Sequence, residues 1–332
     1  MKTLVALALL LAALVVPLGA YVRLSDAGLG CPDWPLCYGK VSPHHAREAI
    51  ARDEALMPHG PVTQAKAWKE MAHRYAAASL GVLILAVAAL AWKKRRDRAA
   101  ASSLLALVAV QGMLGMWTVT LLLKPAIVTA HLAGGMLTVA ALAVMFAARR
   151  LPPVGLPAGR VFAVRCLAVL VFCQILSGGW VSTNYAALAC EGFPLCSGTA
   201  WPDWRPDGAF HIWRELGESP DGTLLPFSAL VAIHWTHRLL ALAVAALTLA
   251  VLILCRREAG LRPHLAWLAA VLLVQVSLGI GNVLLRLPLP LAVAHNAGAM
   301  CLFAVTALLA ARVRSRVRIA DPCQERGTSW QS

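Results

Sequence analysis

Eight long apolar stretches dominate this chain, and each is long enough to cross a bilayer as a helix. A spanning helix needs about 20 mostly apolar residues, and the stretches are Thr3–Val22, Ala72–Trp92, Ala101–Leu123, Ala126–Ala148, Val161–Ser182, Phe227–Cys255, Pro263–Leu285 and Pro290–Arg312. Only 14% of the 332 residues are charged, whereas soluble domains have about 25%. A water-soluble globule is therefore excluded, and so is disorder, which needs low hydrophobicity. The sequence predicts an all-α integral membrane protein with eight transmembrane helices.

Lysine and arginine gather in the connections after the second, fourth and sixth stretches and in the tail after the eighth. They are Lys93, Lys94, Arg95, Arg96 and Arg98; Arg149, Arg150, Arg160 and Arg165; Arg256, Arg257 and Arg262; and Arg312, Arg314, Arg316 and Arg318. Cytoplasmic loops carry an excess of such residues, so both termini are predicted to be cytoplasmic. The net charge of +14 is then explained by basic residues that orient the chain in a lipid bilayer. No nucleic-acid partner is expected.

The chain repeats itself. Cys31, Pro35, Cys37 and Gly39 recur 159 positions later, and a second set recurs 164 positions later: His73-Arg74, Gln111, Leu114-Gly115, His131 and Gly134. Each half holds four stretches, an even number, so both halves enter the membrane from the same side. We therefore expect parallel four-helix-bundle repeats, residues 1–150 and 151–332, related by a pseudo-twofold axis along the membrane normal. The first stretch matches the fifth, so it is kept as a helix and not interpreted as a signal peptide.

Four histidines are the candidate ligands. His73 and His131 lie in the second and fourth stretches of the first half, and His237 and His295 are their counterparts in the second. Ionisable residues inside a span are costly and indicate function. Imidazoles from two facing helices can ligate a haem iron axially, whereas tetrahedral zinc would need three or four ligands in one place. Four histidines recurring in register favour bis-histidine haem over histidines that only bond the backbone.

Two arginines and one glutamate adjoin these ligands. Arg74 and Arg238 each follow a candidate ligand directly, and each could pair with a haem propionate or simply reach the membrane interface. Glu70 lies three residues before His73 and shares its helix face, but its counterpart is His234. A carboxylate that is present beside only one of the two sites indicates that the reaction takes place at that site. The alternative is a glutamate at the helix start, where the helix dipole favours a negative charge. His234 is not expected to bind iron.

Two cysteine pairs occupy equivalent loops. Cys31 and Cys37 recur as Cys190 and Cys196, and the five intervening residues allow a local disulfide in each loop. These loops face the oxidising side if the membrane is a bacterial inner membrane. The pattern fits either a structural disulfide that stabilises a short loop or a redox-active cysteine pair.

Three segments resemble the haem A synthase family. They are the loop Gly19–Cys37, the motif Glu70-x-x-His73-Arg74, and Pro288–Gly298 with its Ala294-His295-Asn296 core. The resemblance covers nearly the whole chain. It implies oxidation of the C8 methyl of haem O to a formyl group by successive hydroxylation, giving the haem A cofactor of cytochrome oxidase.

The resemblance also implies roles for the two halves. His73 and His131 would flank the substrate haem with Glu70 beside the reaction site, and His237 and His295 would hold a b-type haem. Disulfides Cys31–Cys37 and Cys190–Cys196 are implied on the periplasmic side. Bis-histidine ligation leaves no open iron position, so either one ligand on the substrate side leaves or the oxygen comes from water.

Partners and a competing function follow from the same residues. Haem O would be delivered by haem O synthase, and an electron donor is required that the residues do not identify. Small residues on the helix faces are compatible with a homo-oligomer.

The competing function is a non-catalytic di-haem membrane electron-transfer protein, which would have two equivalent haem sites and would not need an acidic residue beside only one of them. A transporter would place its polar groups at mid-membrane.

Overall fold

The computed structural model describes residues 1–148, 150–219 and 221–316. Two of the basic residues used above for orientation, Arg149 and Arg318, lie outside the described residues. Within the described part, eight helices are long and apolar enough to cross a membrane. They are α1 (Lys2–Leu24), α3 (Gln64–Lys93), α4 (Arg98–Thr120), α5 (Pro125–Ala147), α6 (Ala158–Thr183), α7 (Phe227–Cys255), α8 (Arg262–Leu284) and α9 (Leu289–Arg312). The prediction of an eight-helix membrane protein is confirmed.

Helix α3 begins earlier than the apolar pattern predicts. It starts at Gln64 and not at Ala72, and the Thr63 side chain caps it by accepting a 3.1 Å hydrogen bond from the Lys66 backbone N–H. A threonine N-cap satisfies one of the amides that a helix start leaves without a partner. The added turns are polar, so hydropathy alone missed them. Glu70 therefore lies inside the helix, and the alternative of a glutamate at the helix start is wrong.

Short elements outside the membrane helices also escaped prediction. A ten-residue helix, α2 (Arg47–Leu56), lies in the loop between α1 and α3. Strand β1 (Val154–Leu156) pairs in parallel with β2 (Val313–Ser315), with Val154 opposite Val313. Single 3-10 turns, η1 (Ala186–Leu188) and η2 (Ala259–Leu261), precede α7 and α8. Three-residue strands are too short to show a period of two. Within residues 1–148, 150–219 and 221–316 the fold is all-α apart from this two-stranded ladder.

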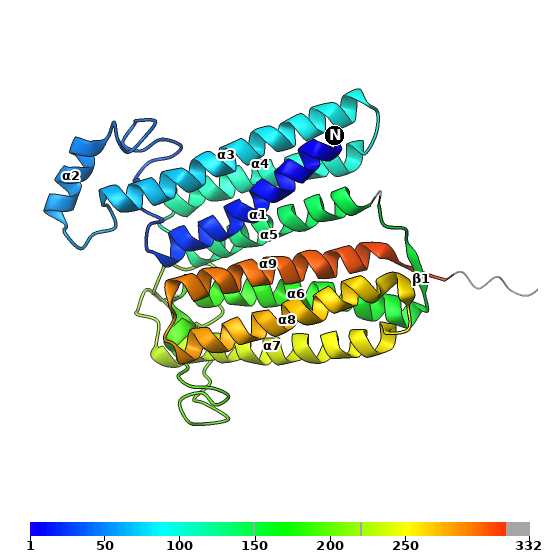
Figure 1. The fold of residues 1–332 in the computed structure, drawn as a ribbon. Coiled ribbons are helices and arrows are strands. Elements are labelled where there is room, and N and C mark those ends of the chain that lie inside the picture. Colours follow the sequence, from blue (N-terminus) through cyan, green and yellow to red (C-terminus); the bar gives the residue numbers. More distant parts are fainter. Residues whose placement is uncertain (149, 220, 317–332) are drawn as a thin grey trace, which may run out of the picture.

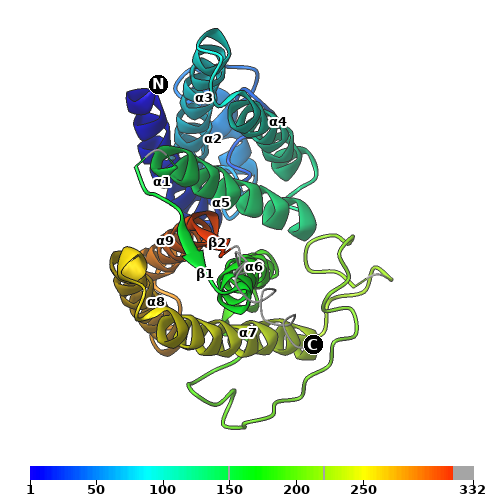
Figure 2. The ribbon, with the colours of Figure 1, turned by 90° about the vertical axis from the view of Figure 1, so that its right-hand side faces the viewer.

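The long helices form two groups of four. Helices α1, α3, α4 and α5 pack together, and so do α6, α7, α8 and α9, as Figure 2 shows in projection. The groups meet where α5 contacts α6 and α9 and where α1 contacts α9. Buried side chains of both groups form one continuous apolar core, which includes Ala8, Ile84, Met136, Leu167 and Leu309.

The connections are divided between the two ends of the bundle. The N-terminus and the β1–β2 ladder lie at one end of the helices, and α2 with the long loop between α6 and α7 lies at the other (Figure 1). At that second end, Arg23 at the end of α1 donates to the Tyr185 hydroxyl at 3.0 Å and to the Ser182 carbonyl at 3.1 Å. Lys124 pairs with Glu215 at 2.6 Å. Polar contacts between the halves thus gather at the loop end.

Candidate active site

The four histidines lie on four different helices, two in each group. His73 is on α3 and His131 on α5, and these rings are near enough to interact electrostatically. His237 on α7 and His295 on α9 are related in the same way. The structure therefore brings the sequence-predicted residues together as two pairs, one in each group of helices.

Each histidine ring packs against a glycine of a neighbouring helix. A methyl carbon added at Gly19 of α1 would lie 2.9 Å from Cε1 of His73. The same test gives 3.3 Å for Gly115 and His131, 3.0 Å for Gly178 and His237, and 3.0 Å for Gly279 and His295, again to Cε1. At such distances a larger residue would have to displace the ring, so each glycine makes the space that one ring occupies. The pairings also recur between the halves.

The ring nitrogens fit a group that is bound between the rings. The Nδ1 atoms of His73, His131 and His295 are buried and have no hydrogen-bond partner among the described residues. A metal-bound histidine uses Nε2 for the metal and keeps a proton on Nδ1, so the fit rests on the pairing of the rings and not on these Nδ1 atoms. Two imidazoles presented from separate helices suit the axial positions of a haem iron, and the structure therefore fits a haem in each half.

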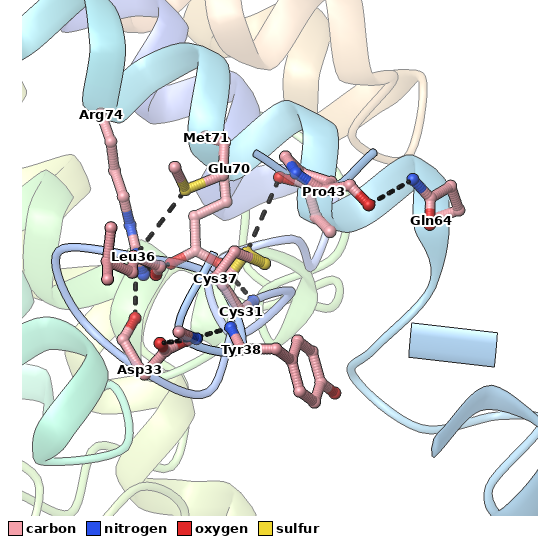
Figure 3. Close-up of a disulfide and its surroundings, with 12 residues drawn as sticks. Cys31, Asp33, Leu36, Cys37, Tyr38, Pro43, Gln64, Glu70, Met71 and Arg74 are labelled. Atoms are coloured by element: carbon pink, nitrogen blue, oxygen red, sulfur yellow. Dashed lines mark hydrogen bonds and ion pairs between the residues drawn. A yellow bond between two sulfur atoms is a disulfide. The ribbon is translucent and has the colours of Figure 1, made fainter. Parts of the chain in front are cut away.

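Glu70 is held by the first cysteine loop (Figure 3). Its carboxylate, which is 4% exposed, accepts a 2.9 Å hydrogen bond from the Cys31 backbone N–H and forms an ion pair with Arg74. Arg74 also donates to the carbonyl oxygens of Asp33 at 2.8 Å and Leu36 at 2.6 Å. Glu70 and Arg74 thus fix the loop onto α3, a role that sequence reasoning did not predict.

The second cysteine loop is attached in the same way but without the acid. Arg238 donates to the carbonyl oxygens of Cys190 at 2.6 Å and Leu195 at 3.1 Å. Its Nε lies 3.4 Å from Nε2 of His234, which is 5% exposed and takes the place of Glu70. Both arginines therefore hold loop carbonyls, and their pairing with haem propionates remains a prediction.

Both cysteine pairs lie at bonding distance in these loops. The Sγ atoms are 2.10 Å apart in Cys31–Cys37 and 1.93 Å apart in Cys190–Cys196. All four side chains are almost completely buried. Each disulfide thus closes the loop that the neighbouring arginine holds.

Gly30 allows a test of whether the first cysteine loop packs tightly against α3. A methyl carbon at Gly30 would lie 2.6–2.8 Å from the backbone of Lys66 and Ala67 in α3. Since backbone atoms cannot move aside cheaply, Gly30→Ala is expected to lift the loop and expose the disulfide. The rate at which a water-soluble phosphine reduces Cys31–Cys37 measures this, and it should rise several-fold.

The matched control for Gly30→Ala is Gly28→Ala in the same loop. There the added methyl would meet only the end of the Leu123 side chain, at 3.2 Å, so the reduction rate should stay near that of the unchanged protein. Equal rates for the two variants would contradict tight seating of the loop on α3.

Sequence reasoning missed two polar residues beside His237. Ser177 Oγ lies 3.2 Å from the His237 Nδ1, and Gln174 Nε2 donates to the His237 carbonyl oxygen at 3.1 Å. Their signal was available, because both are polar residues within an apolar span. They have no polar counterpart in the first half, where Val15 and Leu18 stand at the equivalent positions, so the repeat does not mark them.

Comparisons with known proteins identify the family of the chain. Residues 2–307 match the COX15-CtaA family, described as cytochrome oxidase assembly protein. A haem A synthase of Shewanella oneidensis is 37% identical over 294 residues, which cover 87% of this chain and 89% of that protein. Haem A synthases of Bacillus licheniformis and Mesorhizobium japonicum are 26% and 29% identical, over 90% and 88% of this chain and 92% and 84% of their own lengths.

Proposed function

The chain belongs to the haem A synthase family, and from this premise we propose that residues 1–150 bind the substrate haem and residues 151–332 retain a b-type haem. Membership makes the protein a membrane oxidoreductase that converts haem O to haem A for cytochrome oxidase. The eight apolar helices and the bacterial relatives fit a multi-pass protein of the inner membrane.

The observation that carries the proposal is the pair of half-buried histidines in each half, each ring against its own glycine. His237 and His295 would hold the b-type haem, and His73 and His131 would flank the substrate haem. A haem bound in the second half supplies a one-electron redox centre within the membrane. The protein's own part is to present the imidazoles, exclude water with apolar helix faces, and keep the two haems in separate groups of helices.

Glu70 distinguishes the halves chemically. It lies on the same face of α3 as His73, and its counterpart in the second half is His234. We assign to Glu70 the holding or transfer of a proton while the haem methyl is oxidised, with Arg74 and the Cys31 N–H fixing the carboxylate. Arg74 and Arg238 would also pair with the haem propionates.

The proposal includes an orientation and partners. The basic connections would face the cytoplasm and the two cysteine loops the periplasm, since positive residues mark the cytoplasmic side. Both termini would then be cytoplasmic. Haem O would come from haem O synthase within the bilayer, and a separate donor would supply electrons. Small residues on the helix faces leave room for a homo-oligomer.

Extraction and chromatography of the haems from purified protein, with a pyridine haemochrome spectrum, tests the two-haem proposal. We expect haem B together with haem O, haem A or the hydroxylated intermediate. Haem B alone, unchanged in cells that also make haem O, would instead favour the di-haem electron-transfer protein. No haem in fresh membranes would contradict both.

A further inference from the structure

The two halves differ in what holds the ligand histidine on the second long helix of each group. In the second half, Nδ1 of His237 lies 3.2 Å from both Ser177 Oγ and Gln174 Nε2. Of these two atoms the hydroxyl oxygen can accept a hydrogen bond from a protonated Nδ1, whereas the amide nitrogen can only donate. In the first half, Nδ1 of His73 is buried and meets no hydrogen-bond partner in residues 1–148, 150–219 and 221–316.

The helix that packs against each ring explains the difference. Gly19 of α1 and Gly178 of α6 occupy equivalent places against His73 and His237. One residue before each glycine stands Leu18 in α1 and Ser177 in α6. A leucine side chain has no hydrogen-bonding atom, so the hydroxyl that reaches His237 has no counterpart beside His73.

The other two ligands do not share this difference. His131 and His295 both have a buried Nδ1 without a hydrogen-bond partner in the described part of the chain. The equivalent glutamines differ, because Gln275 Nε2 lies 3.3 Å from the His295 Nε2, but this contact is at the nitrogen that a bound iron would take. At Nδ1, the nitrogen that keeps the proton of a metal-bound histidine, the difference between the halves lies at His73 and His237.

A partner on Nδ1 strengthens a histidine ligand. When Nε2 binds a metal, Nδ1 carries the proton and donates it to the partner, which fixes the ring orientation and raises the basicity of Nε2. Losing such a partner typically costs 10–100-fold in metal affinity. In the second half Gln174 also holds the His237 backbone, through the 3.1 Å bond to its carbonyl oxygen. The second half thus has both a fixed ring and a stronger donor nitrogen.

We propose that Ser177 is the positioning residue that makes the second half the permanent haem site, and that Leu18 leaves His73 a weaker ligand from which the substrate haem can be released. This inference rests on the proposed assignment of the two haems. It explains how two nearly identical bundles retain one haem and exchange the other.

The test compares Ser177→Ala with Ser177→Thr in the full-length protein. Haem loss from the second half is followed by transfer to apomyoglobin, and the midpoint potential of the b-type haem is measured by redox titration. For Ser177→Ala we expect haem loss about 10-fold faster and a raised potential, because a less basic imidazole stabilises the ferric state less. Ser177→Thr keeps the hydroxyl and should restore both values.

The reciprocal variant is Leu18→Ser, which gives His73 a hydroxyl. It should increase the amount of haem O, haem A or intermediate that copurifies with the protein. Ser79→Ala is the matched serine control, because Ser79 bonds only its own helix, at the Tyr75 carbonyl, and should change none of these values.

The outcomes separate this inference from the proposed function. If His237→Ala removes the b-type haem but Ser177→Ala changes neither haem loss nor potential, the role of Ser177 is wrong and the haem assignment stands. If His237→Ala retains the b-type haem, the assignment itself fails, and the inference fails with it. A Ser177→Thr variant that behaves like Ser177→Ala would show that packing matters and the hydroxyl does not.

Discussion

Replacing His237 or His295 with alanine is expected to remove the b-type haem spectrum of the purified protein, whereas the same change at His73 or His131 is expected to leave it. The two pairs lie in separate groups of helices, so a ligand lost in one half leaves the other pair complete. The dithionite-reduced absorbance per mole of protein measures this directly. We expect near-complete loss for the second pair and at least about four-fifths retention for the first, and no haem A formation by any of the four variants.

The control is His59→Ala, because His59 is exposed in the loop between α1 and α3. It should leave the spectrum and haem A formation unchanged, which guards against effects of expression or detergent. A b-type haem that disappears with His73→Ala while persisting in His237→Ala would reverse the assignment of the halves.

The long helices could be predicted from the sequence because each is a single apolar run of bilayer length. Helix α7, Phe227–Cys255, has the predicted bounds, since its ends coincide with a sharp change in polarity. Helix α3 does not, because its first turns are polar and its start depends on the Thr63 cap. Helix α2 lies outside the membrane and is mostly polar, so hydropathy carried no sign of it.

The candidate ligands could be found because they recur, but their surroundings could not. The packing of Gly19 on His73 joins residues from different helices, and nothing in the local pattern of either helix encodes it. Arg74 was predicted either to pair with a haem propionate or to reach the membrane interface, and the structure adds an ion pair with Glu70 and hydrogen bonds to the Asp33 and Leu36 carbonyl oxygens. Those carbonyls lie about 40 positions away in the chain, in a loop whose path only the folded structure defines.

Glu70→Gln is expected to stop conversion of haem O to haem A while the b-type haem stays bound. Loss of a group that transfers a proton typically costs about 10²–10⁴-fold in rate, and glutamine cannot take up the proton. The measurement is chromatography of extracted haems from cells supplied with haem O, with the reduced spectrum recorded on the same preparation. An unimpaired Glu70→Gln enzyme would remove Glu70 from the chemistry.

The structural role of Glu70 must be separated from this effect, because the carboxylate also holds the cysteine loop. Glutamine keeps an oxygen that can accept the Cys31 N–H but loses the charge that pairs with Arg74. The phosphine reduction rate of Cys31–Cys37 reports whether the loop is still seated, and Gly30→Ala gives the rate for a lifted loop. Inactivity with slow reduction would assign Glu70 to proton transfer, whereas inactivity with fast reduction would mean that it acts by seating the loop over the substrate haem.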